Sequence, residues 1–157
     1  MSCPTYDEQM NSMANRPEVQ IMQHFRHHGQ MTTYDHSVNV MKMSVAIARK
    51  LNMTDAQIEN VIVGAMLHDF FLYDYYETGR IRKEGIHAWC HPQTALNNAS
   101  KLFKLNRNQK NIIRSHMFPT TLFHPPLCRE AWVVCMADKV CAIKELAASN
   151  HKMAMDL

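Results

Sequence analysis

Apolar residues recur along this chain at the spacing of helix faces, and no stretch alternates apolar and polar residues as a half-buried strand would. The clearest case is Val38, Met41 and Val45, which share one face of a segment that Thr32 can cap and that ends near Leu51. Only 4 glycines and 6 prolines interrupt the 157 residues. The sequence therefore predicts an all-α fold, a single compact bundle of about six helices.

Residues that favour helix ends indicate the boundaries of the helices. Pro17 and Gly29 bracket a first helix, because proline favours a helix start and glycine the position just past an end. Thr54 is the N-cap of a capping box and begins a helix that runs to His68. Further helices are expected from Pro92 to Leu105, from the cap Asn106 to His116, and at 129–148, with the longest irregular connections at 73–91 and 117–128.

Composition narrows the class of protein. The formal net charge of +3 is too small to indicate a nucleic-acid partner, and no run approaches the roughly 20 apolar residues of a membrane span. Met1–Met10 lacks the apolar core of a signal peptide, and the 5 cysteines form no Cys-x-x-Cys pair, so a cytoplasmic location is expected. We expect one domain, 1–157, with its core at about 30–145 and the helix at 17–29 packed on it. The 13 methionines can fill a core or a partner surface, which leaves monomer and homodimer open.

Four polar residues lie inside apolar sequence. His36 shares a helix face with apolar residues, His68 and Asp69 end the run that closes with Leu67, and Asp138 interrupts the apolar helix AWVVCMADKVCAI. A lone buried histidine is usually a hydrogen-bonded core residue, but a buried carboxylate needs a cation. Together the two imidazoles and two carboxylates offer a mixed nitrogen and oxygen shell, which suits Zn, Mn, Fe or Ni.

The order of these residues resembles the HD superfamily of metal-dependent phosphohydrolases. The resemblance is carried by YDHS, LHDF and ADKV and covers about residues 30 to 145. The segments FFLYD and HMFP are also similar to those of small bacterial HD proteins. The resemblance implies an HD-domain helical bundle that binds a divalent metal through His36, His68, Asp69 and Asp138.

Two further histidines match a second metal site. In HD proteins with two metals, such as the HD-GYP phosphodiesterases and the bacterial diadenosine tetraphosphatase, two histidines lie between the central His-Asp and the last Asp. The resemblance implies that His91 and His116 are these ligands and that Asp69 bridges two ions. From the residues alone, His91 should be extended at a helix start because Pro92 follows it, and His116 is an ordinary histidine near a helix C-terminus.

Other residues are weaker candidates for catalysis. Pro92 argues against one helix carrying both His87 and His91, and His87 is expected near the second metal or the substrate phosphate. Asp74 could orient water or a ligand imidazole, and Lys139 could neutralise a phosphoryl oxygen or pair with a surface acid. Further candidates are Arg80, Arg82 and Lys83 as phosphate-binding cations and Tyr73, Tyr75 and Tyr76 as stacking residues. His24, His27 and His28 are expected to form a solvated helix end, with His28 reaching toward the site.

The expected function is hydrolysis of a small phosphate ester or nucleotide, with Asp69, His87, Asp74 and Lys139 as the catalytic candidates. Water held between two metals loses a proton near neutral pH and can attack phosphorus. The chain lacks the Gly-Tyr-Pro segment of the cyclic dinucleotide phosphodiesterases, and Leu72 stands where one-metal nucleotidase relatives carry an acid. Two alternatives stay open: a non-catalytic module that senses a nucleotide or binds a metal, and a di-iron oxygenase of HD-like fold.

Overall fold

The computed structural model describes residues 4–27, 31–74, 81–82 and 85–155, and their side chains except at 81–88 and 149–155. The described residues form seven α-helices, one short 3-10 helix and one hairpin of two-residue strands, so the predicted all-α fold is confirmed. The elements are α1 (Tyr6–Ala14), α2 (Pro17–Gln20), η1 (Ile21–His24), α3 (Thr33–Lys50), α4 (Asp55–Leu67), β1 (Ile81–Arg82), β2 (Gly85–Ile86), α6 (His87–Leu102), α7 (Arg107–Ser115) and α8 (Arg129–Met155).

Side-chain caps begin the helices that carry the site. Thr32, Thr54 and Asn106 each accept a hydrogen bond from the backbone N–H three residues later. In each case the residue at that third position returns a hydrogen bond to the cap, which completes a capping box. These three caps occur where the sequence predicts them.

Several predicted boundaries are wrong. The first helix does not run to Gly29: α2 passes into η1, which ends at His24, and Phe25 is extended. The helix ends because the backbone pairs elsewhere, with Arg26 bridging Thr32 and the N–H of Thr33 donating to the carbonyl of Phe25 at 2.8 Å.

The second wrong boundary is that of α6, which begins at His87 and contains Pro92. His87 and His91 therefore lie on one helix, contrary to the prediction, and His91 is not extended. A proline in the second turn removes a single backbone hydrogen bond, and the packing of α6 beside α7 outweighs that local cost. The structure also adds α1, which was not predicted, and extends α8 beyond residue 148 to Met155.

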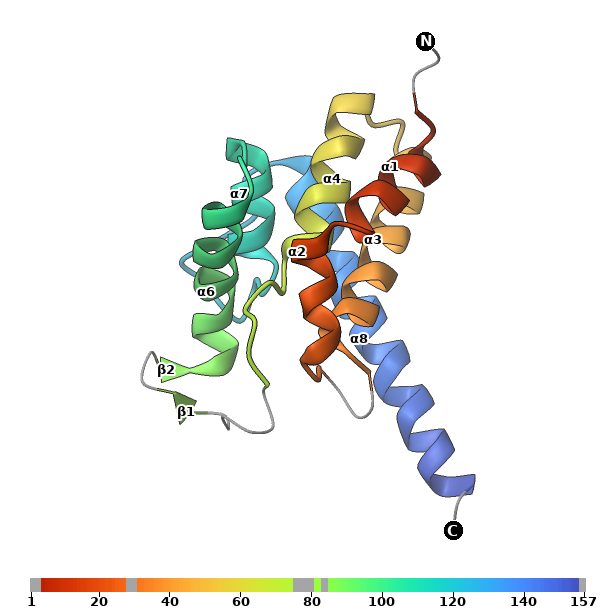
Figure 1. Cartoon of the computed structure of the whole chain (residues 1–157), viewed down its shortest axis with the longest axis vertical. Coiled ribbons are helices and arrows are strands. Elements are labelled where there is room, and N and C mark those ends of the chain that lie inside the picture. Colours follow the sequence, from red (N-terminus) through yellow and green to blue (C-terminus); the bar gives the residue numbers. More distant parts are fainter. Residues whose placement is uncertain (1–3, 28–30, 75–80, 83–84, 156–157) are drawn as a thin grey trace.

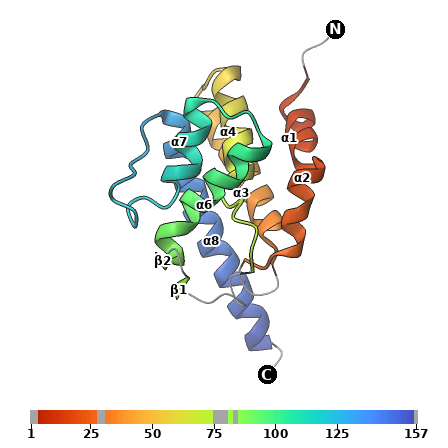
Figure 2. The same ribbon diagram turned by 60° about the vertical axis from the view of Figure 1, so that its left-hand side comes forward.

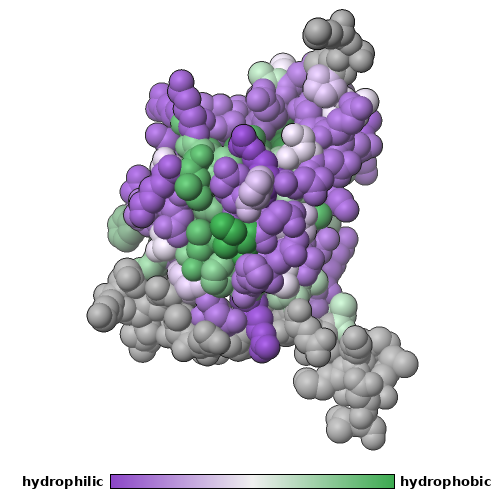
Figure 3. Space-filling view, viewed as in Figure 1, coloured by the Kyte–Doolittle hydropathy of each residue, from purple (hydrophilic) through white to green (hydrophobic). Residues whose placement is uncertain are grey.

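The helices form a bundle around α4 and α8. Helices α6 and α7 lie along one side of this pair, and α1, α2 and α3 lie along the other (Figures 1 and 2). The core between them includes Val40, Val61, Ile112 and Val134, all fully buried. One face of the molecule is mostly hydrophilic, with a hydrophobic area near its centre (Figure 3). Among the described residues, no helix is long and apolar enough to cross a membrane.

Candidate metal centre

Four predicted residues form a first cluster of donor atoms near the middle of the bundle. His36 comes from α3, His68 and Asp69 from the end of α4, and Asp138 from α8. Nε2 of His36 lies 3.1 Å from Oδ1 of Asp138 and 3.9 Å from Oδ2 of Asp69. Nε2 of His68 lies 3.7 Å and 3.4 Å from the same two oxygens. Two imidazoles and two carboxylates from three helices therefore face one small volume.

The remaining two predicted ligands form a second cluster on the other side of Asp69. His91 of α6 and His116 at the end of α7 point their Nε2 atoms at Oδ1 of Asp69, at 3.3 Å and 3.4 Å. The two Nε2 atoms are 2.8 Å apart. All three residues are buried, so the cluster lies inside the protein.

The hydrogen bonding of His68 and His116 leaves their Nε2 atoms available as ligands. Each histidine is the C-cap of its helix, and its Nδ1–H donates to the carbonyl three residues earlier: Ala65 at 2.7 Å for His68, and Ile113 at 2.8 Å for His116. These carbonyls belong to the last turn, where the helix itself supplies no N–H partner. In the neutral ring the proton is then on Nδ1, and the lone pair of Nε2 faces Asp69.

His36 is oriented by a residue that the sequence analysis missed. Its Nδ1 donates to Oε2 of Glu145 at 2.7 Å, and Asn39 donates to the other carboxylate oxygen at 3.0 Å. A carboxylate behind a ligand imidazole fixes the ring and makes it a better metal ligand. A sequence signal existed, because Glu145 follows Asp138 by seven residues and so lies on the same face of one helix.

A second missed residue is His27, which precedes α3. Its Nε2 lies 2.9 Å from Oδ2 of Asp69, and its ring stacks on that of His36 with centroids 4.0 Å apart. His24 is exposed, in agreement with the predicted solvated helix end, and His28 lies outside the described residues. No sequence signal distinguished His27, since three histidines occur within five positions and no helical spacing selects one of them.

The residues of both clusters fit divalent ions. In the described part of the chain, Nε2 of His68 and Oδ1 of Asp69 are buried without a hydrogen-bond partner. Such atoms are costly inside a protein unless something satisfies them. Imidazole nitrogens and carboxylate oxygens are the donors that Zn, Mn, Fe and Ni accept. The buried clusters could therefore hold divalent metal ions.

The pKa values of Asp69 and His36 indicate that the first cluster favours positive charge. Burial alone would raise the pKa of Asp69, but the charge of His68 and the neighbouring imidazoles of His116 and His27 hold it well below its usual range. Burial also acts on His36 by lowering its pKa, and its hydrogen bonds to Asp138 and Glu145 outweigh burial and raise the pKa to about 9. Without a metal ion, the first cluster therefore takes up a proton instead.

Three weaker candidates have different outcomes. The amine of Lys139 donates to the carbonyls of His116 at 2.9 Å and Cys135 at 3.3 Å, so it joins the end of α7 to α8. Asp74 belongs to none of the three donor groups found among the described residues. The side chain of His87 lies outside the described residues.

Of the other residues weighed, Tyr73 contacts Phe71, with ring centroids 4.6 Å apart. The side chains of the other stacking candidates and of the loop cations lie outside the described residues: Tyr75, Tyr76, Arg80, Arg82 and Lys83.

Comparison with known proteins agrees with this geometry. The HD domain family matches residues 33–143, which include all six predicted ligands but not His27. No curated protein and no solved structure matched the chain. HD domains bind divalent metals and are generally associated with metal-dependent phosphohydrolases. With 33–143 matched and the central His-Asp pair buried between two further donor sets, the chain belongs to the HD domain family.

Proposed function

We propose that this protein is a metal-dependent phosphohydrolase that holds two divalent ions and cleaves a small phosphate ester or a nucleotide. The observation that carries the proposal is the orientation of the Asp69 carboxylate, whose two oxygens face different clusters. Oδ2 faces the cluster of His36 and His68, and Oδ1 faces the cluster of His91 and His116. A carboxylate with one oxygen toward each of two donor sets has the arrangement of a bridging ligand, which supports two ions over one.

The metals and the protein would have separate tasks. When bound, divalent ions at such a site lower the pKa of water enough to supply a nucleophile near neutral pH and neutralise phosphoryl oxygens. The protein supplies the orientation of the imidazoles, through Ala65, Ile113 and Glu145, and a buried setting in which charges interact strongly.

The two fully described buried cysteines do not suggest a thiol nucleophile. Burial raises the pKa of Cys141 to about 11, which keeps its thiol protonated near neutral pH. Cys135 is buried and its Sγ lies 3.3 Å from the carbonyl of Phe118. The nucleophile is thus better supplied by the metal centre than by these thiols.

A phosphatase panel tests the proposal. Protein loaded with Mn is incubated with small phosphate esters and nucleotides, and released phosphate or nucleoside is measured. We expect at least one substrate to be cleaved, and cleavage to fall at least about a hundredfold in Asp138→Asn, which keeps the size of the side chain but removes its charge. His68→Ala is expected to lose activity and bound metal together. The control is His24→Ala, an exposed histidine outside both clusters, which should match the wild type.

Other results would contradict the proposal in identifiable ways. Thermal stabilisation by a nucleotide without any product would indicate a sensing module. Consumption of oxygen by the protein loaded with ferrous iron, without phosphate release, would indicate an oxygenase. If active protein binds only about one equivalent of metal, the protein is a hydrolase but the proposed second ion is wrong.

A further inference from the structure

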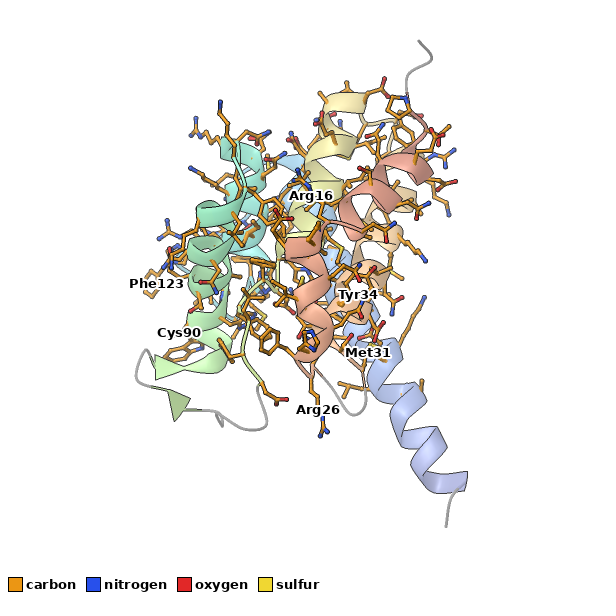
Figure 4. All side chains as sticks on the ribbon, viewed as in Figure 1. Arg16, Arg26, Met31, Tyr34, Cys90 and Phe123 are labelled. Atoms are coloured by element: carbon orange, nitrogen blue, oxygen red, sulfur yellow. The ribbon has the colours of Figure 1, made fainter. Side chains whose placement is uncertain are left out.

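His27 reaches the metal centre from a loop, unlike the other donors. Arg26 forms a backbone bridge with Thr32, and the N–H of His27 donates to the carbonyl of Met31 at 2.9 Å. Successive side chains of an extended segment point to opposite sides. Arg26 points away from the bundle (Figure 4), and His27 turns inward onto Asp69.

The ring of His27 is placed to share the first cluster. It lies nearly parallel to the ring of His36, with 9° between the planes. Its ligand atom, that of His36 and an oxygen of Asp69 all lie within 4.8 Å of one another. The geometry thus groups His27 with two of the four donors that face the first ion, but not with His68 or Asp138.

Exposure locates His27 on the open side of that cluster. The side chain of His27 is 13% exposed and that of Asp138 is 12%, compared with 0% for His36 and His68 and 4% for Asp69. A molecule that approaches the first ion from solvent therefore meets His27 and Asp138 before the other donors.

We propose that His27 is a replaceable ligand of the first ion: it binds the metal in the resting protein and gives up its position to a phosphate oxygen. The inference rests on the proposed function and adds a resting state to it. Catalytic metals need a position that substrate can occupy, and His36, His68 and Asp138 are held by helices. His27 lies outside these helices, so its displacement disrupts no helix.

Cobalt tests the proposal, because the visible absorption of bound Co²⁺ reports the number and type of its ligands. Wild type, His27→Ala, His27→Gln and the control His24→Ala are loaded with Co²⁺ and titrated with inorganic phosphate. Gln can still donate a hydrogen bond to Asp69 but supplies no imidazole. His24 is three residues away, exposed, and outside the clusters, so His24→Ala should match the wild type throughout.

The expected result has three parts. Phosphate changes the wild-type spectrum, and the spectrum of phosphate-free His27→Ala already differs from that of the wild type. Both His27 variants bind phosphate about tenfold more tightly than the wild type, because no protein ligand must leave; this factor corresponds to about 1.4 kcal/mol. Added imidazole returns His27→Ala toward the wild-type spectrum and toward the weaker phosphate affinity.

Two outcomes overturn the inference, and they differ in what else they affect. If the wild type takes up Co²⁺ and hydrolyses phosphate esters, but the His27→Ala spectrum and phosphate affinity are unchanged or His27→Gln matches the wild type, then His27 only donates to Asp69 and the proposed function stands. If the wild type takes up no Co²⁺, both the inference and the proposed function fail.

Discussion

His36, His68 and His116 show how single residues prepare a metal centre. Each directs Nδ1 away from the donor clusters, toward Glu145 or toward a backbone carbonyl, and each presents Nε2 to a carboxylate. The apolar sequence around His36 and His68 made them visible as candidates. Their partners were harder to find: a backbone carbonyl has no sequence signature, and the helical spacing of Glu145 from Asp138 does not show that it pairs with His36, 109 residues away.

Glu145→Gln should weaken metal binding at the first cluster by about 10- to 100-fold, because His36 loses the carboxylate that accepts from its Nδ1. The affinity is measured by competition with a chelator of known strength. Lys144→Gln is the matched control, since it changes the charge of the neighbouring exposed residue on the same helix. Equal affinities in Glu145→Gln and the wild type would show that Glu145 does not support the ligand.

At the scale of elements, the close approach of α4 and α7 decides where the two clusters meet. A Cβ on Gly64 would lie 2.6 Å from Cγ2 and 2.8 Å from Cβ of Ile112, which is fully buried. Only glycine therefore lets the helices pack at this distance. The same two helices end in His68 and His116, whose ring centroids are 4.9 Å apart.

Gly64→Ala should lower the free energy of unfolding by about 1–2 kcal/mol, measured by urea denaturation. Overpacking costs about 1–3 kcal/mol and exceeds the ~1 kcal/mol that alanine gains in helix propensity. The contact includes Cβ of Ile112, which cannot swing aside. Combined with Ile112→Ala, the loss should be smaller than the sum of the two single losses. If the losses of unfolding free energy in the two single variants simply added in the double variant, the contact between Gly64 and Ile112 would not be the source of the strain.

At the scale of the whole molecule, the fold buries carboxylates whose charge must be balanced by protonated imidazoles or by a metal ion. Burial opposes charge on Asp69 and Asp138, and the surrounding histidines nevertheless hold both pKa values below the usual range. These carboxylates stabilise the metal-free protein above the unfolded pKa of about 3.8, and this contribution is lost as pH falls. The raised pKa of His36 acts in the opposite direction: its contribution is complete below pH 6.5 and is lost as pH rises through about 9.

The difference in Tm between metal-loaded and chelator-treated protein should therefore widen as pH rises from 6 toward 9. Over this range the metal-free protein loses the stabilisation of protonated His36, whereas the loaded protein binds metal more tightly because its imidazoles need no longer release protons. Differential scanning calorimetry of both forms at several pH values measures the difference. A gap that stays constant or narrows toward pH 9 would contradict this charge balance.

By itself, the sequence determined most of the helices and most of the candidate ligands. Caps such as Thr54 and helical periodicity are local properties, and His36, His68 and Asp138 are conspicuous because polar residues are costly in apolar helices. Only the tertiary structure decided that α6 continues through Pro92, that His27 reaches Asp69, and which oxygen of Asp69 faces each cluster. The reason is physical: these features depend on contacts between distant segments, whose packing energy outweighs local backbone preference and leaves no periodic trace in the chain.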